Sequence, residues 1–459
     1  MTTFLTNTIN DGNVIERIFQ KEDDMNLIIN KTLTLNGQVI VPGSKSQSIR
    51  AIMLASLCEG ESTLINTLHS DDTQDAINVC RSLGAKISES GHALTIKSMG
   101  LPLKLITTEI HSGNSGVTTH FVMPILGLRE NADQPIILNC GEQMRARPVK
   151  PLVEALTRLG LSIKYLENNN TLPISISGAL KGGKTYIDGM SSQYLSALLF
   201  ALPCAPFDSE INVKNLQERP YAEMTLEWLK NQGILFHHLS TGNLDTYNIK
   251  GGQSYKNICA TIPGDFSSAS YLIAASVLIP GEVILQGLNM ADPQGDKQLV
   301  GILQKMGADI VIHPTHLRIR GGKRLSGIKI DANDIPDLLP TLAVVGTYAS
   351  GKTEIYNVAH ARIKETDRIQ SMAKGLTNMG AKIDEQDDGL IIYQSALKGA
   401  PVKGYGDHRT VMALSIAGMI ADGETIIDDG EAIHKTFPTF ITIMQSLGAN
   451  MEVESASSS

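Results

Sequence analysis

Basic residues stand at the start of a predicted helix, where positive charge is unfavourable unless an anion is bound. In the segment 41–50 a proline and a glycine end a strand, and Ser44 or Ser46 can cap the helix that follows. Lys45 and Arg50 add two cations to a helix end that the dipole already makes positive. The pattern indicates an anion-binding site, although a solvated loop with basic residues is the alternative.

The same placement of basic residues near glycine-rich or serine-rich helix starts recurs along the chain. Arginine suits carboxylate and phosphate groups because its planar guanidinium donates two parallel hydrogen bonds. Each residue alone is more typical of a solvated charge, but the series predicts a site for a small polyanion. The further members of the series are Arg145, Arg147, Lys364, Arg368, Arg409 and Lys435.

Carboxylates lie among these cations, at Asp337, Glu365 and Asp407. One interpretation is that they only orient the basic side chains. The other is that they transfer protons, which requires carboxyl or amino groups close to the reacting atoms. The candidates for proton transfer are Lys45, Asp337 and Glu365.

Two segments supply further hydrogen-bond donors. The glycines of segment 113–116 allow the backbone to approach a bound anion closely. Ser191, Ser192 and Gln193 offer side-chain donors. Paired serines are also common helix caps, so this segment favours an anion site only together with the cations.

A repeat positions these residues. A helix that ends in glycine, followed by a strand, recurs at spacings of 76, 73, 74, 73 and 68 residues. A second helix in each unit is apolar on nearly all sides, which is typical of a buried helix. We therefore expect an α/β fold of six βαβαββ-like units with buried helices whose polar starts point the same way. The repeated glycines are Gly84, Gly160, Gly233, Gly307, Gly380 and Gly448.

Six units exceed one hydrophobic core, so we expect two domains of three units, with an anion-binding cleft between them. The predicted division is a flexible extension at 1–25, one domain at 44–260, and a second domain of 26–43 plus 261–459. The crossover between repeats three and four is expected within 247–262.

The composition limits the class of function. The chain has 459 residues, 42% of them hydrophobic, and a net charge of −8, which argues against a nucleic-acid surface. No apolar run reaches the roughly 20 residues of a membrane span. The five cysteines form no CxxC pair and indicate reduced thiols in a cytoplasmic protein.

In order and spacing, these motifs resemble the 5-enolpyruvylshikimate-3-phosphate synthase family, the 3-phosphoshikimate 1-carboxyvinyltransferases. The resemblance runs from about residue 35 to 447. It rests on Pro-Gly-Ser-Lys-Ser-x-Ser-x-Arg at 42–50, Gly-Asn-x-Gly at 113–116, Arg-Pro at 147–148, Ser-Ser-Gln at 191–193, Gly-Asp-x-Ser-Ser-Ala at 264–269, Ile-Pro-Asp at 335–337, Lys-Glu-Thr-Asp-Arg at 364–368, Asp-His-Arg at 407–409 and Lys-Thr-Phe-Pro at 435–438.

The resemblance implies transfer of the enolpyruvyl group of phosphoenolpyruvate to the 5-hydroxyl of shikimate 3-phosphate, with release of phosphate, in the shikimate pathway to aromatic amino acids. It implies that phosphoenolpyruvate is held by Lys45, Asn114, Gly116, Arg147, Gln193, Arg368, Arg409 and Lys435. It implies that shikimate 3-phosphate is held by Lys45, Ser46, Arg50, Ser191, Ser192, Gln193, Tyr221, Asp337 and Lys364.

The resemblance also implies roles. Asp337 would take the proton of the acceptor hydroxyl, and Lys45 and Glu365 would manage the proton at the methylene carbon. Arg50 and Tyr221 would face the acceptor carboxylate. No metal or organic cofactor is implied, and the partners are the two small substrates, with neither nucleic acid nor membrane. The protein is expected to be a cytoplasmic monomer. It is also expected to be a glyphosate target, because Gly116 leaves room for the herbicide.

Four positions depart from the family pattern. Ile49 and His120 replace polar or arginine residues, and His360 stands where asparagine is frequent. Glu218 stands where a serine usually contacts the acceptor phosphate. Three outcomes follow: Glu218 turns away to pair with Arg219 or Lys214, it remains and weakens acceptor binding, or the acceptor is a different cyclic carboxylate.

Two rival functions are separated by particular residues. The nucleotide-sugar enolpyruvyltransferases of cell-wall synthesis usually carry a cysteine five residues before Arg-Pro, where this chain has Glu142, and Lys-Asn in place of Lys45 and Ser46. A non-catalytic anion-binding protein would be expected to lose Asp337 or Glu365, and both are present. The enzyme acting on shikimate 3-phosphate is therefore favoured.

Overall fold

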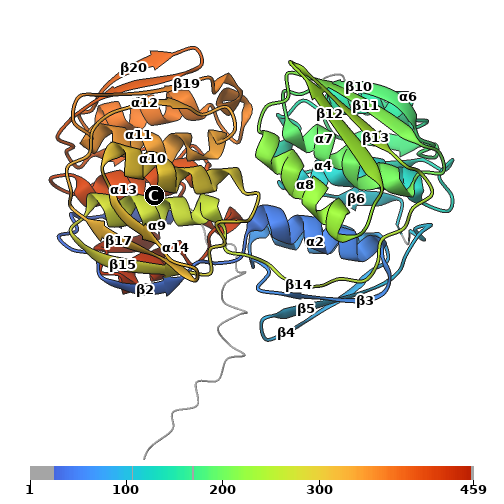
Figure 1. The fold of residues 1–459 in the computed structure, drawn as a ribbon, viewed down its shortest axis with the longest axis horizontal. Helices are drawn as coiled ribbons and strands as arrows, with labels where there is room; N and C mark the ends of the chain where they lie inside the picture. The colour runs from blue at the N-terminus through green and yellow to red at the C-terminus, as the bar shows by residue number, and fades with distance from the viewer. Residues whose placement is uncertain (1–24, 106, 168–169, 456–459) are drawn as a thin grey trace, which may run out of the picture.

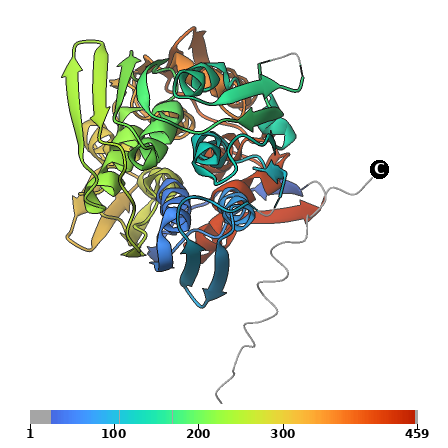
Figure 2. The same cartoon turned by 90° about the vertical axis from the view of Figure 1, so that its right-hand side faces the viewer.

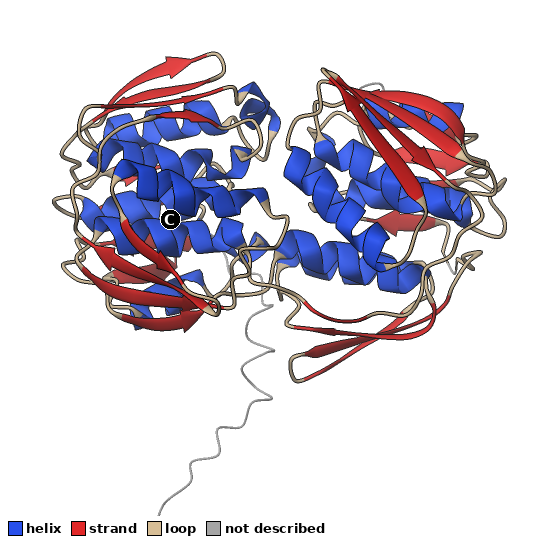
Figure 3. Cartoon of the chain, viewed as in Figure 1, coloured by secondary structure: helices blue, strands red, loops and turns tan. Residues whose placement is uncertain are grey.

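The computed structural model describes residues 25–105, 107–167 and 170–455, which form two lobes with helices inside and sheets outside (Figures 1 and 3). The predicted α/β class is confirmed, with six sheets of four strands in this part of the chain. Residues 1–24 of the predicted N-terminal extension lie outside the described residues. The prediction was wrong for Met25, because it begins strand β1 (Met25–Ile29) and pairs with strand β24 (Met451–Ser455).

Each sheet corresponds to one βαβαββ repeat, in which one edge strand pairs in parallel with its neighbour and the other pairs are antiparallel. The N-terminal lobe has three repeats. The first contains β14 (Cys259–Thr261), α2 (Lys45–Leu57), β3 (Glu59–Ile65), α3 (Asp71–Ser82), β4 (Lys86–Ser90) and β5 (Ala93–Met99), and the second contains β6 (Glu109–His111), α4 (Gly116–Ile125), η1 (Leu126–Leu128), β7 (Ile136–Asn139), α5 (Glu142–Arg145), α6 (Lys150–Arg158), β8 (Ser162–Tyr165) and β9 (Ile174–Ser177). The third contains β10 (Gly183–Asp188), α7 (Ser192–Ala201), η2 (Leu202–Cys204), β11 (Ser209–Lys214), α8 (Arg219–Asn231), β12 (Phe236–Thr241) and β13 (Leu244–Ile249).

The C-terminal lobe repeats the same order. Its first repeat contains β2 (Gly37–Ile40), α9 (Phe266–Leu278), β15 (Gly281–Gln286), η3 (Gly295–Lys297), α10 (Gln298–Met306), β16 (Asp309–Ile312) and β17 (His316–Gly321). The second contains β18 (Lys329–Asp331), η4 (Pro336–Leu338), α11 (Leu339–Tyr348), β19 (Lys352–Tyr356), η5 (Ala359–Ile363), α12 (Arg368–Asn378), β20 (Lys382–Gln386) and β21 (Gly389–Tyr393). The third contains β22 (Pro401–Val402), α13 (His408–Ile420), β23 (Thr425–Ile427), η6 (Gly430–Lys435), α14 (Phe440–Ser446), β24 and β1.

The predicted glycine series marks helix ends. Gly84 has a φ of 100° and Gly307 a φ of 107°, in the left-handed region that other residues adopt at a cost. Strands β4 and β16 begin two residues after these glycines. The glycine therefore reverses the chain from helix to strand within a few residues, which is why the repeat was visible in the sequence.

The first helix of each repeat is buried on all sides. Helices α9, α11 and α13 are mostly apolar, with polar residues mainly in their first turns or small in size, and nearly all of their residues are buried. A helix with this composition is stable only inside a core. Figure 2, turned by 90° from Figure 1, shows helices end-on with the strands around them. The polar residues at the starts of these helices are thereby left at the boundary between the lobes.

Two separate clusters of buried apolar side chains fill the lobes, one drawn from 49–262 and the other from 25–41 and 266–451. We propose that these cores are the two domains, with chain crossings near Pro42 and Pro263. Thr261 pairs with Ile65 and Ile262 lies in the first cluster, so the predicted boundary after residue 260 falls two residues early. The expected crossover at 247–262 was also too wide, because 247–249 belong to β13.

Strand β1, from the N-terminal part of the chain, lies in the sheet of the last repeat, between β23 and β24. Leu27 is 0% exposed, while Val453, its partner on β24, is 46% exposed. We expect Leu27→Ala to lower the free energy of unfolding by about 2–5 kcal/mol, because it removes buried methyl groups and leaves a cavity. Urea unfolding measures this, and Val453→Ala is the matched control. Equal effects of the two substitutions would contradict this role of β1.

Candidate active site

One cleft between the lobes is lined by residues from both. Lys45 and Ser192 are the first residues of helices α2 and α7, and Arg368 is the first residue of α12. Helix starts from the two lobes thus face the same space, as the sequence predicted. The lining residues are Lys45, Ser46, Arg50, Val117, Arg147, Ser192, Gln193, Glu218, Tyr221, Asp337, Lys364, Glu365, Arg368 and Arg409.

Four residues from the predicted site lie beside the cleft instead of lining it. The Lys435 Nζ atom lies 3.6 Å from Glu365 Oε1 and donates to Gln143 at 3.0 Å. Gly116 abuts the Arg147 guanidinium. Ser191 caps α7 by accepting the Gln193 N–H at 3.4 Å, and the Asn114 side chain packs against Gly141.

Arg368 is the most heavily paired cation of the cleft. Its guanidinium donates to Asp337 at 2.6 Å, to Glu365 at 2.6 Å and to Asp407 at 2.8 and 3.1 Å, and its side chain is 1% exposed. Burial opposes its charge, but the three carboxylates outweigh burial and raise the pKa of Arg368. Asp407 therefore acts through Arg368, whereas Asp337 and Glu365 also face the cleft.

Asp337 is surrounded by donors. One oxygen accepts from Arg409 at 2.7 Å and from the Tyr221 hydroxyl at 2.8 Å, and the other accepts from Arg368. Burial favours the neutral carboxyl, but Arg409 and Arg368 overcome it and hold the pKa of Asp337 well below its usual range. Asp337 is therefore ionised at neutral pH, in the form that can accept a proton.

Glu365 joins the two lobes. Arg147, from the N-terminal lobe, forms an ion pair with Glu365 at 2.9 Å. Burial raises the pKa of the Glu365 carboxyl, but Arg147 and Arg368 together lower it well below its usual range. Gln143 also reaches across, donating to the Gly406 carbonyl at 3.1 Å. The cleft is therefore bridged by polar contacts at several points.

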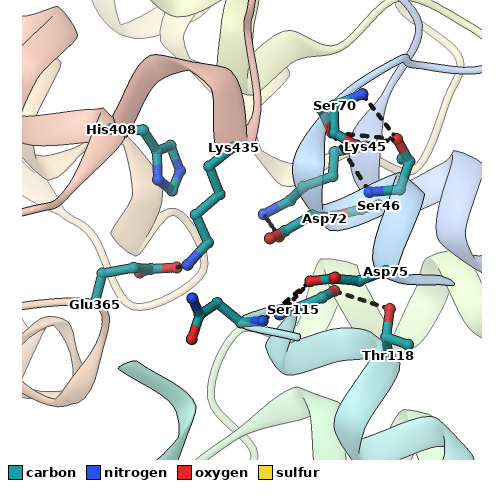
Figure 4. A network of polar contacts seen from close by, with 12 residues as sticks. Lys45, Ser46, Ser70, Asp72, Asp75, Ser115, Thr118, Glu365, His408 and Lys435 are labelled. Atoms are coloured by element: carbon teal, nitrogen blue, oxygen red, sulfur yellow. Dashed lines mark hydrogen bonds and ion pairs between the residues drawn. The ribbon is translucent and has the colours of Figure 1, made fainter. Parts of the chain in front are cut away.

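Two aspartates of α3 extend the network and were not predicted. Lys45 Nζ lies 3.0 Å from Asp72, whose side chain is 3% exposed (Figure 4). Asp75 accepts the N–H groups of Asn114 and Ser115 at 3.0 and 3.2 Å. Acidic residues in the first turn of a helix are ordinary, since they complement the dipole, so Asp72 could not be singled out from the sequence, and Asp75 lies one turn further along α3.

Arg50 donates hydrogen bonds to several groups of the protein. It donates to Thr225 Oγ1 at 2.9 Å, to the Ser46 carbonyl at 3.0 Å and to the Tyr221 carbonyl at 2.9 Å. Burial lowers the pKa of Arg50 to about 10, so it remains charged. Arg50 thus also ties α2 to α8, a structural role that the sequence did not indicate.

Glu218 points into the cleft. Its carboxylate accepts from the Ser192 hydroxyl at 2.9 Å and backbone N–H at 3.3 Å, and it forms an ion pair with Lys364. Burial raises the pKa of the Glu218 carboxyl, but Lys364 and then His360 outweigh burial and lower it. The suggested pairing with Arg219 or Lys214 is wrong.

Arg219 is committed elsewhere, because its guanidinium donates to Asp245 at 2.8 and 2.9 Å. His120, another departure from the family pattern, has its Nδ1 2.7 Å from Gln193 Oε1, and burial lowers the pKa of its imidazole to about 4. It is therefore neutral and positions Gln193 at the cleft.

Among the described residues, no group of His, Cys, Asp and Glu side chains is arranged to hold a metal ion.

The six-repeat architecture and this cleft of opposed helix starts define a two-lobed α/β protein that binds small anions between its halves. The chain belongs to the EPSP synthase (3-phosphoshikimate 1-carboxyvinyltransferase) family, whose model matches residues 29–444.

Individual relatives agree. The chain is 44% identical over 416 residues to a 3-phosphoshikimate 1-carboxyvinyltransferase of Acetivibrio thermocellus, covering 91% of this chain and 97% of the relative. It is 42% identical to one of Methanocaldococcus jannaschii, covering 93% and 99%. A solved EPSP synthase of Acinetobacter baumannii superposes with a TM-score of 0.79 at 26% identity, covering 94% of this chain and 100% of that one. None of the helices described here is long and apolar enough to cross a membrane.

The pKa of Asp75 makes the stability of this network depend on pH. Burial, with repulsion from Asp72, raises the pKa of Asp75 to about 7. Between about pH 4 and 7 the folded protein keeps a proton that the unfolded chain loses, so stability falls as pH rises. We expect Asp75→Asn to reduce this slope in urea unfolding measured from pH 4 to 8. Exposed Asp133→Asn is the control, and an undiminished slope in Asp75→Asn would contradict the assignment.

Proposed function

We propose that this chain transfers the enolpyruvyl group of phosphoenolpyruvate to the 5-hydroxyl of shikimate 3-phosphate and releases phosphate, a step of the shikimate pathway. The observation that supports it most is the convergence of Arg147, Arg368 and Arg409 with two ionised carboxylates, Asp337 and Glu365, in one cleft. Seven curated relatives at 40% identity or more carry the name of this activity, which favours shikimate 3-phosphate over a different cyclic carboxylate.

The phosphoenolpyruvate half of the site is assigned to the densest group of cations. Its carboxylate and phosphate would be shared among guanidinium and ammonium groups, since charge-assisted hydrogen bonds to such groups are strong. The residues proposed for this half are Lys45, Asn114, Gly116, Arg147, Gln193, Arg368, Arg409 and Lys435. The acceptor half would be formed by Lys45, Ser46, Arg50, Ser191, Ser192, Gln193, Tyr221, Asp337 and Lys364.

The proposed chemistry is addition followed by elimination. Asp337 takes the proton of the acceptor hydroxyl, and the hydroxyl oxygen bonds to the central carbon of phosphoenolpyruvate. The methylene carbon of phosphoenolpyruvate gains a proton in the same addition. The resulting tetrahedral ketal then loses phosphate and one methyl proton, which restores the double bond. Lys45 and Glu365 carry the proton to and from the methyl carbon, and the cations stabilise the developing charge.

Three finer properties belong to the same proposal. Activity as a monomer belongs to the proposal, because the two lobes that line the cleft are joined covalently within one chain. The described cysteines are free thiols, which suits a reducing compartment and supports a cytoplasmic location. Inhibition by glyphosate, as a mimic of phosphoenolpyruvate, belongs to the proposal because Gly116 has no side chain and lies against Arg147 of the phosphoenolpyruvate half.

The role of Asp337 can be tested by removing its charge. We expect Asp337→Asn to reduce kcat for phosphate release by about 10²–10⁴-fold, as is typical for a general base. Phosphoenolpyruvate binding, measured by calorimetry, should be retained, because Arg368 and Arg409 lose a competing anion. Asp387→Asn, on an exposed loop, is the control. Turnover close to that of the wild type would remove Asp337 from the mechanism.

Gly116 provides a test of the phosphoenolpyruvate half. A Cβ atom at this position would lie 2.6 Å from Arg147 Nη1 and 3.2 Å from Gln193 Oε1. We expect Gly116→Ala to raise the KM of phosphoenolpyruvate about tenfold and to weaken glyphosate inhibition, because Arg147 must move. Gly301→Ala on helix α10, where an added Cβ meets nothing within 4 Å, is the control. A changed acceptor KM with an unchanged phosphoenolpyruvate KM would reverse the assignment of the two halves.

A further inference from the structure

The carboxylate of Glu218 occupies donors that the proposed function assigns to the acceptor. Ser192 gives it both a hydroxyl and a backbone N–H, and Lys364 gives it an ammonium group. Glu218 itself is 2% exposed. An acceptor phosphate that binds Lys364 and Ser192 must therefore displace a buried carboxylate of the protein.

The backbone holds Glu218 at this point. It is the residue before α8, with φ 53° and ψ 37°, a left-handed conformation that is uncommon for glutamate. Its N–H donates to the Asn333 carbonyl at 3.3 Å, and the next N–H donates to Asp334 at 3.3 Å. Both acceptors belong to the other lobe, so these backbone contacts hold Glu218 at the junction of the lobes.

His360 is the group to which the displaced carboxylate can turn. It lies in η5, four residues before Lys364, and is 5% exposed. Its Nε2 atom is buried and has no hydrogen-bond partner among the described residues. Glu218 and His360 are close enough for each to shift the pKa of the other. The imidazole thus has an unused buried nitrogen and interacts electrostatically with the Glu218 carboxylate.

We propose that Glu218 is a specificity-determining residue that competes with the acceptor phosphate for Lys364 and Ser192, and that His360 takes up a proton and pairs with Glu218 when the phosphate binds. This inference rests on the proposed function, because the phosphate is that of shikimate 3-phosphate. The two unusual residues then form one unit, in which a histidine compensates for a glutamate.

The exchange sets the direction of a pH effect. The groups that act on His360 are Glu218, Lys364, Asp337 and the Asn333 carbonyl, and burial is the largest influence, so the pKa of His360 lies below 6.5 before the acceptor binds. A bound phosphate together with a transferred Glu218 carboxylate adds negative charge and raises that pKa. Acceptor binding therefore takes up a proton and weakens as pH rises above the pKa of the free histidine.

The first experiment compares Glu218→Ser, Glu218→Gln and the control Glu223→Ser, an exposed glutamate on the same helix. We expect both Glu218 variants to lower the acceptor KM, and the acceptor Kd from calorimetry, by about tenfold or more, with the phosphoenolpyruvate KM changed by less than about threefold. A variant that fails to fold cannot bind more tightly, so the gain is diagnostic. An unchanged or raised acceptor Kd in both variants would overturn competition.

The second experiment counts protons. Calorimetry of shikimate 3-phosphate binding at pH 7.5, in buffers of different ionisation enthalpy, should show uptake of about one more proton by the wild type than by His360→Asn or Glu218→Ser. Equal proton uptake by all three proteins would overturn the role of His360. If shikimate 3-phosphate binds but neither the wild type nor the variants release phosphate from phosphoenolpyruvate, the proposed function fails. The binding tests still show whether the acceptor phosphate displaces Glu218. Binding of unphosphorylated shikimate in preference by the wild type would overturn both.

Discussion

Buried positive charge is the constraint on which the cleft depends. Arg368 and Arg409 are 1% and 5% exposed, and both lie in the first turn of a helix, where the dipole adds positive potential. A buried guanidinium without a partner would cost several kcal/mol of folding free energy. Asp337 and Glu365 meet this requirement, and Glu365 also pairs with Arg147 from the opposite lobe. Neutralisation of charge therefore also connects the two halves of the molecule.

Under the proposed mechanism, this pairing would give Asp337 two roles that conflict. Ion pairs with Arg368 and Arg409 keep it ionised, but they also lower its pKa and make it a weak base. A ligand anion that engages the two arginines would draw them from Asp337 and raise its pKa, so basicity would appear only when substrate is present. The same carboxylate can thus stabilise the protein alone and act as a base in the complex.

The sequence predicted what is encoded locally. Glycines at helix ends revealed six repeats, and cations at helix starts revealed the cleft, because each signal lies within a few residues of the chain. Partner choice was not predictable in this way. Glu218 was expected to turn to Arg219 or Lys214, its neighbours in sequence, but it pairs with Lys364, 146 residues away on the other lobe. Tertiary contacts favour this pairing, because the backbone N–H groups of Glu218 and Arg219 donate to Asn333 and Asp334 of the other lobe.

In a cleft whose cations are already paired with carboxylates, the affinity for an anion depends on how much better that anion binds the cations than the carboxylates do. An anion that enters gains contacts with Lys364 or Arg368 but must replace a carboxylate that already has them. A monoanion makes an exchange of nearly equal groups and gains little. A phosphate dianion brings more charge and more acceptor oxygens than the carboxylate it replaces, so the exchange favours it. Buried acidic residues among the cations therefore weaken binding of every anion, but they weaken it least for phosphorylated ones, which is a physical basis for selectivity in a protein of net charge −8.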